Sequence, residues 1–205
     1  MHLRRRARQR TAAAGIGLAL LAVTGCGVDE PDVETAPTAT TSPTPTPSPT
    51  PTLDLTRLPE RPAAMAEPTK EGAIAAATYV LDLYGYTFAT GDLEPWRGIT
   101  LDSCTFCVKV TDMVDEIYRS GDQSSGSTFA VDSTRGVEIA DDQWFSVDLR
   151  VTQSPSLRTD ARGEVVGDDP GGEYRAVFAL SWNDGWRVDS MGFTEPDAEN
   201  PAIDE

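Results

Sequence analysis

Two cysteines, Cys104 and Cys107, are the first candidates for chemistry in this chain. Residues three apart on a helix lie on one face, so the two sulfurs would be neighbours. A helix N-terminus lowers the pKa of a thiol, so an exposed pair there could exchange disulfides with other proteins. The alternatives are a small-loop structural disulfide or a reduced structural pair, and the adjacent Phe106 and Val108 favour burial over reactivity.

Asp82 is the second candidate, because it is the one charged side chain between Ile74 and Gly91. Thr78 and Tyr86 lie four residues to either side, on the same helix face. A buried carboxylate beside a tyrosine donor could abstract a proton next to a carbonyl group. The alternative is a polar stripe that faces solvent, and a buried Asp82 with a raised pKa would favour the enzyme.

Aromatic side chains are the third group of candidates. They could line an apolar ligand pocket, or they could simply fill the core, which is the commoner role of aromatic residues at core spacing. The set consists of Tyr84, Trp96, Tyr118, Trp144, Phe178 and Trp182.

Histidine is nearly absent, since His2 is the only one in the chain. Ser-His and Cys-His nucleophiles and the usual zinc sites all need histidine. No calcium loop of the D-x-[DN]-x-[DN]-G type occurs, and Asp168-Asp169 in a glycine-rich turn is too generic to be one. We therefore expect no catalytic residue set, no metal and no cofactor.

The chain is strongly acidic, with a net charge of -16. Residues 1–25 contain five arginines and no acidic residue, so the remainder is more negative still. Such a chain repels phosphate backbones, and nucleic acid is not an expected partner.

The first 25 residues have the features of an export signal. A basic stretch to Arg10 is followed by an apolar stretch, residues 11–23, that is too short for a membrane span. Val23-Thr24-Gly25-Cys26 then resembles the bacterial lipobox, which implies a lipid on the Cys26 sulfur and cleavage before it. The expected location is the extracytoplasmic face of the cell membrane, where disulfides persist and where Cys104 and Cys107 are left to pair.

Composition divides the rest of the chain into three parts. Residues 26–62 are rich in Pro and Thr and are expected to form a disordered stalk of extended polyproline II character. Residues 63–195 are expected to form a single globular domain, and residues 196–205 a disordered acidic tail.

The domain is expected to begin with helices and continue with strands. The pattern predicts a helix from Pro68-Thr69 to about Thr90, a short turn with Pro95 and Trp96, and a second helix from Cys104 to about Ser120, capped by Ser103. The apolar stripe of the second helix is predicted to be Phe106, Val110, Met113, Val114 and Ile117. Strands are predicted at 128–140, 143–152, 174–182 and 186–194, with an edge hairpin within 156–166. The predicted class is α+β, with two long N-terminal helices packed on a curved antiparallel sheet of four to six strands.

This order resembles the cystatin-like or nuclear-transport-factor-like (ketosteroid-isomerase-like) cone, a curved sheet around a long helix. A second resemblance is carried by Tyr79, Tyr84, Tyr86, Ala89-Thr90-Gly91-Asp92, Cys104-Thr-Phe-Cys107 and Ile117-Tyr118. Through these residues the segment 62–195 resembles a family of actinobacterial lipoproteins of unknown function. That resemblance implies a lipoprotein of this fold and supplies no activity.

The leading functional hypothesis is a membrane-anchored lipoprotein without catalytic activity. Its domain would bind a small ligand, a cell-wall component or an envelope protein. One alternative is an isomerase- or dehydratase-like enzyme that uses an acid and a tyrosine inside the cone, and the other is an envelope thiol-disulfide oxidoreductase that uses Cys104 and Cys107. The candidate pocket residues are Asp82, Tyr84, Trp96, Tyr118 and Phe178.

Overall fold

The structure, a computed structural model, describes residues 54–198. The predicted signal peptide, Cys26, most of the predicted stalk and the tail beyond Ala198 lie outside the described residues. The described part contains a short 3-10 helix, three α-helices and seven strands, which makes the class α+β. The elements are η1 (Ala63–Ala66), α1 (Lys70–Thr90), α2 (Glu94–Ile99), α3 (Thr105–Arg119), β1 (Gln123–Gly126), β2 (Phe129–Ala140), β3 (Trp144–Gln153), β4 (Ser156–Thr159), β5 (Val165–Asp169), β6 (Gly172–Trp182) and β7 (Trp186–Thr194).

Helix α1 begins and ends close to the residues that the sequence indicates. The hydroxyl of Thr69 accepts a hydrogen bond from the Gly72 backbone N–H, which caps the first turn. Gly91 adopts the left-handed conformation at the C-terminus. Among the described residues, no helix is sufficiently long and apolar to span a membrane.

The other two helices differ from the expectation. Pro95 and Trp96 lie in helix α2 and not in a turn, since Pro is compatible with a first helical turn. Cys104, not Ser103, is the N-cap of α3, and its sulfur accepts from the Cys107 N–H. Met113 does not belong to the buried stripe, because its side chain is exposed whereas Val110, Val114 and Ile117 are buried.

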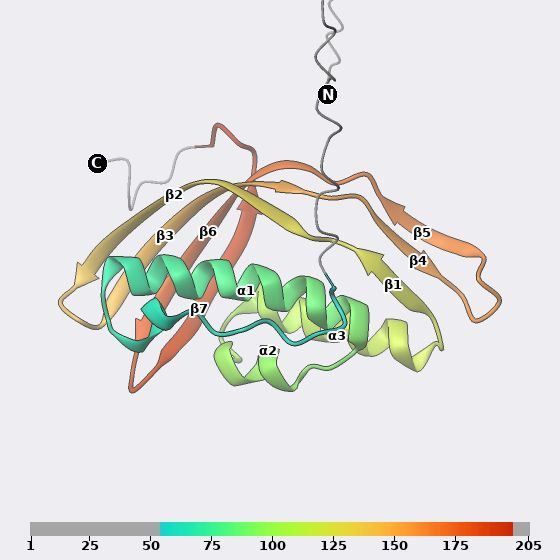
Figure 1. Ribbon diagram of the computed structural model, residues 1–205, viewed down its shortest axis with the longest axis horizontal. Helices are drawn as coiled ribbons and strands as arrows, with labels where there is room; N and C mark the ends of the chain where they lie inside the picture. The colour runs from blue at the N-terminus through green and yellow to red at the C-terminus, as the bar shows by residue number, and fades with distance from the viewer. Residues whose placement is uncertain (1–53, 199–205) are drawn as a thin grey trace, which may run out of the picture. The chain divides into compact units, whose positions relative to one another are not determined.

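The strands form two antiparallel sheets where one sheet of four to six strands is expected. The larger sheet has the order β2-β3-β6-β7 and the smaller one the order β1-β4-β5. The predicted edge hairpin is the β4–β5 pair, and β1 was not predicted. Figure 1 shows α1 and α3 together on one side of the two sheets.

Prolines and glycines explain why there are two sheets. Strands β1, β4 and β5 lead directly into or out of β2, β3 and β6, and the breaks lie at Gly126-Ser127, Pro155 and Pro170-Gly171. Proline has no N–H to donate to a ladder. Gly126 and Gly171 have φ values of 86° and 70°. A Cβ on Gly126 would lie 2.1 Å from the Pro155 carbonyl oxygen, and a Cβ on Gly171 would lie 2.3 Å from that of Gln153.

Apolar side chains at every second position of the larger sheet form one side of the core. Phe145, Val147, Leu149 and Val151 are all buried on one face of β3, as the period-two pattern predicts. They face α1, which contributes Val80, Leu81 and Leu83 to the same core.

The two edges of the larger sheet meet inside the fold. Phe129 of β2 and Phe193 of β7 stack with ring centroids 5.1 Å apart, although β3 and β6 separate their strands. Neighbouring strands are about 4.8 Å apart, so a flat sheet would keep these edges about 14 Å apart. The sheet is therefore curled. The ring of Tyr84 on α1 contacts Phe129 at 5.5 Å and Phe193 at 6.5 Å, which fills the space between the edges.

A tight joint connects α1 to the next two helices. The hydroxyl of Tyr86 donates to Asp92 Oδ2 at 2.8 Å, and Asp92 Oδ1 accepts from the Glu94 N–H at the start of α2. The ring of Tyr118 on α3 packs on Gly91, and its hydroxyl donates to the Phe88 carbonyl at 3.0 Å. The Thr90-Gly91-Asp92 segment noted in the sequence therefore has a structural role, because it fixes the connection between α1 and α2.

Replacing Gly91 by Ala is expected to destabilise the protein more than replacing Gly121 by Ala. Both glycines have φ near 77°, so both substitutions carry a left-handed strain of about 1 kcal/mol. Only at Gly91 would the new Cβ lie 2.8 Å from the Tyr118 ring, which adds about 1–3 kcal/mol of overpacking. Urea denaturation of the two variants measures the difference in free energy of unfolding, and equal losses would contradict the proposed ring contact.

Candidate functional site

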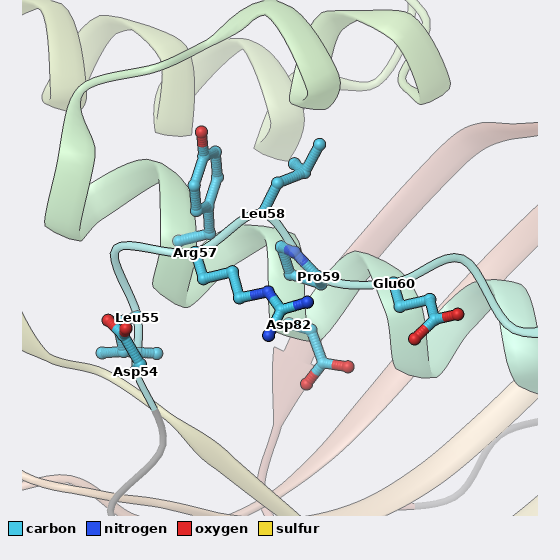
Figure 2. A pocket seen from close by; sticks show the side chains of 8 residues that line it. Asp54, Leu55, Arg57, Leu58, Pro59, Glu60 and Asp82 are labelled. Atoms are coloured by element: carbon cyan, nitrogen blue, oxygen red, sulfur yellow. The ribbon is translucent and has the colours of Figure 1, made fainter.

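A charged hollow beside the predicted site residue Asp82 lies on the outer side of α1. We call it the strap cleft, and the strap is the segment 54–60 that forms one wall (Figure 2). The cleft has a volume of about 420 Å³. It is lined by Asp54, Leu55, Arg57, Leu58, Pro59 and Glu60 of the strap and by Asp82 and Tyr86 of α1.

The strap begins earlier in the chain than the predicted domain boundary at residue 63. Two bonds shape its start, since the N–H and the hydroxyl of Thr56 both donate to Asp54 Oδ1, at 3.0 and 2.6 Å. These bonds lower the pKa of Asp54. Just after the strap, the guanidinium of Arg61 lies 5.8 Å from the ring centroid of Tyr79, a cation–π contact that ties the chain to α1.

Asp82 lies in the strap cleft and not in the core. Its side chain is exposed, but the strap removes part of its water, and this burial raises the pKa of the Asp82 carboxyl. Among the described residues it has no hydrogen-bond or ion-pair partner, although Figure 2 shows the Arg57 side chain reaching over the same hollow.

Tyr86 does not act with Asp82. Its hydroxyl donates to Asp92, and this bond is the main reason that the pKa of Tyr86 is raised. The structure therefore brings Asp82 and Tyr86 to one cleft but directs the tyrosine hydroxyl elsewhere. It does not show the acid and tyrosine donor that proton abstraction inside the cone would need.

The predicted aromatic residues are largely packed together. Trp96 and Phe178 are buried, and Tyr118 is half-buried against Gly91. Tyr84 joins Trp96 at 6.3 Å and Phe88 at 4.7 Å between ring centroids. Trp96, Phe178 and Tyr118 therefore belong to the packed interior. Trp144 is exposed, and Trp182 packs on Trp186 and lines a surface hollow with Arg61 and Asp184. Tyr84 reaches a different cavity.

That cavity lies between the helices and the β1-β4-β5 sheet, and we call it the sheet cleft. Its volume is about 220 Å³, and Tyr84, Arg158, Asp168 and Asp169 are among its lining residues. Burial and the charge of Asp169 raise the pKa of Tyr84 to about 12. Sequence reasoning missed Arg158 and set Asp168-Asp169 aside, because only the folding of the β4–β5 hairpin over α3 brings them to Tyr84.

Cys104 and Cys107 form a buried disulfide at the start of α3, with the sulfurs 2.03 Å apart. Their residues are 0% and 2% exposed. The indole N–H of Trp96 donates to the Cys107 carbonyl at 3.2 Å, which joins α2 to α3 beside the disulfide. A buried disulfide at this position stabilises the first turn of α3, which is a structural role. Within residues 54–198, no group of His, Cys, Asp or Glu side chains could hold a metal ion.

Comparisons with known proteins identify a family but no activity. A model described as a family of unknown function, DUF6318, matches residues 57–192. No curated protein matches the chain. Among solved structures, the chain is similar to the intermembrane space region of the chloroplast protein ARC6, with a TM-score of 0.50 and 14% identity over 62% of this chain and 97% of that one. At that identity the likeness concerns the fold alone.

The disulfide is expected to resist alkylation after mild reductant treatment of the folded protein, because both sulfurs are inaccessible. Addition of denaturant together with the reductant should label both Cys104 and Cys107. Mass spectrometry of the labelled protein measures the number of alkyl groups. Rapid labelling without denaturant would instead support an exposed redox pair.

Proposed function

We propose, from the premise that the chain belongs to DUF6318, a family of unknown function, that it is an exported lipoprotein with a ligand-binding domain. Its lipid anchor would be on Cys26, at the extracytoplasmic face of the membrane. The domain would bind in the strap cleft, without turnover, a ligand with a positively charged group on an apolar body. An envelope protein that presents a lysine side chain belongs to the same chemical class.

The lipid anchor is supported by the sequence alone. A basic stretch, a short apolar stretch and Val23-Thr24-Gly25-Cys26 follow one another in the order of a lipoprotein signal. The Pro- and Thr-rich segment that follows would hold the domain away from the membrane surface.

The cone-like fold is also part of the proposal. The two bent sheets and the meeting of Phe129 with Phe193 support a curved sheet wrapped around α1. The aromatic cluster around Tyr84 fills the centre of that curve, so binding is expected in clefts at its surface.

The observation that carries the binding proposal is the Asp82 carboxylate in an open cleft with apolar walls. Leu55, Leu58 and Pro59 supply the walls. Asp54 and Glu60 add negative charge, and since Arg57 is the one cation of the lining, the cleft remains net negative. A partly dehydrated carboxylate without a partner gains more from a cation than a fully hydrated one does. The volume of about 420 Å³ lies within the ordinary range of small-molecule sites.

The anchor is tested by detergent partitioning. The protein expressed in an actinobacterial host is expected to enter the detergent phase of a Triton X-114 extract, whereas Cys26→Ala should remain aqueous or keep its signal peptide. The reason is that multiple acyl chains hold a protein in a bilayer, with about 0.8 kcal/mol from each buried CH₂. Thr40→Ala, in the same N-terminal region, is the matched control. Equal partitioning of the wild type and Cys26→Ala would contradict lipidation.

The strap cleft is tested with three probes that share one apolar chain: octylamine, octanol and octanoate. Octylamine is expected to bind best, and Asp82→Asn should weaken its binding by about three- to tenfold, the loss of one partly exposed charged contact. Asp141→Asn removes an exposed acid outside the cleft and should leave binding unchanged. Isothermal titration measures the three affinities.

The pH dependence adds a second readout. Because the pKa of Asp82 lies above its ordinary value of 3.8, octylamine binding should weaken as the pH falls through that raised pKa. Asp54 has a lowered pKa and stays ionised over this interval. The Asp82→Asn variant should lose most of the dependence. Preferential binding of octanoate, or an unchanged affinity in Asp82→Asn, would refute the proposed cation site.

A further inference from the structure

The sheet cleft is a second hollow on the molecule, separate from the strap cleft. It lies between α1, α3 and the β1-β4-β5 sheet and shares no lining residue with the strap cleft. Tyr84 comes from α1, Arg158 from β4, and Asp168 and Asp169 from β5. Segments far apart in the sequence thus bring donors and acceptors to one place.

Tyr84 is held as a hydrogen-bond donor in this cleft. Its ring is fixed by Phe88 and Phe129, at centroid distances of 4.7 and 5.5 Å. The hydroxyl makes no hydrogen bond within the described part of the chain. Like any tyrosine it is protonated at neutral pH, and its pKa, raised to about 12, keeps it so in alkaline solution as well. It can therefore donate to an acceptor on a ligand in the cleft.

Arg158 is fixed by two acids of neighbouring elements. Its Nε donates to Asp122 Oδ2 at 2.7 Å, and an NH group lies 3.6 Å from Glu116 Oε1 at the end of α3. The two carboxylates compensate the positive charge of the guanidinium and fix its orientation. Its remaining N–H groups can therefore donate hydrogen bonds in a fixed direction, but they add little net positive charge to the cleft. An anionic ligand therefore meets no excess positive charge here.

Asp168 and Asp169 provide acceptors. One oxygen of Asp169, Oδ1, already accepts from the Gly171 N–H at 2.8 Å, which fixes the carboxylate at the rim. Ionised carboxylates only accept, and a guanidinium only donates. A ligand in this cleft therefore needs donors for the carboxylates of Asp168 and Asp169. It also needs acceptors for the Arg158 guanidinium and the Tyr84 hydroxyl.

We propose that the sheet cleft binds an uncharged, hydroxyl-rich ring, such as one sugar residue. Each hydroxyl both donates and accepts, so a ring of hydroxyls can pair with Asp169, with Tyr84 and with the fixed Arg158. Leu157 and Met113 lie exposed beside the cleft and supply apolar surface for the C–H face of such a ring. Two carboxylates disfavour an anion. The volume of about 220 Å³ limits the ligand to a small group.

The test is a titration of the full-length protein, followed by NMR chemical shifts. The probes are uncharged methyl glycosides of glucose, galactose, mannose and arabinose, with glucuronate and glucosamine as charged counterparts. At least one uncharged glycoside is expected to bind saturably, and glucuronate to bind about tenfold more weakly than it. Tyr84→Phe should weaken binding about tenfold, the loss of one hydrogen bond and the stranding of its partner.

Matched variants keep the result interpretable. Tyr84→Phe retains the ring packing, so its thermal midpoint should stay near that of the wild type, and Tyr174→Phe makes the same change outside the cleft. Asp169→Asn keeps an oxygen for the Gly171 N–H and should still weaken binding. Octylamine binding should be unaffected by Tyr84→Phe, which separates this site from the strap cleft.

Three outcomes would overturn the proposal. They are no binding by any uncharged glycoside, equal binding to the wild type and Tyr84→Phe, and tighter binding of glucuronate or glucosamine than of every uncharged sugar. A failure of octylamine to bind would leave this result untouched, because the two clefts have no residue in common.

Discussion

The packing of the Tyr118 ring on the backbone of Gly91 is the contact on which the arrangement of the helices depends. Helix α1 can end abruptly because glycine adopts the left-handed conformation there, and the missing Cβ leaves room for an aromatic ring. Asp92 then links the end of α1 to the start of α2, through Tyr86 and the Glu94 N–H. Since α2 carries Trp96, whose indole bonds to the first turn of α3, the joint fixes three helices together.

The curled sheet has a second consequence, because its interior is filled by aromatic rings. Phe129 and Phe193 meet over Tyr84, so the centre that a cone-shaped enzyme would use is packed. The polar clefts therefore lie at the surface. The strap cleft lies where the strap covers α1, and the sheet cleft lies beside the β4–β5 hairpin. Both clefts depend on α1, which presents Asp82 to one and Tyr84 to the other.

The sequence predicted the helices and strands more accurately than it predicted the two clefts. Period-two alternation indicated β3, β6 and β7, and capping residues indicated the ends of α1, because these signals are local. The exposed position of Asp82 agrees with the solvent-facing alternative considered from the sequence. The cover that the strap provides was not predictable, since α1 is apolar on nearly every side and no polar stripe marks its outer face. The strap was missed because its composition continues that of the Pro-rich segment, while Leu55 meets its neighbour Gly85 only in the folded chain. Arg158 and Asp169 meet Tyr84 through contacts between distant segments, which a single sequence does not show.

The strap lies between the proposed binding cleft and the N-terminal region of the chain. Asp54–Glu60 is both a wall of the cleft and the part of the described domain that directly follows the N-terminal region of the chain. Any tension applied upstream of Asp54 acts first on this wall, before it reaches α1 or the sheets. A ligand that bridges the strap and Asp82 would therefore oppose peeling of the strap, and pulling would in turn speed release of the ligand. In the proposed function, the residues that contact the ligand are thus also the first residues of the described domain to bear a load.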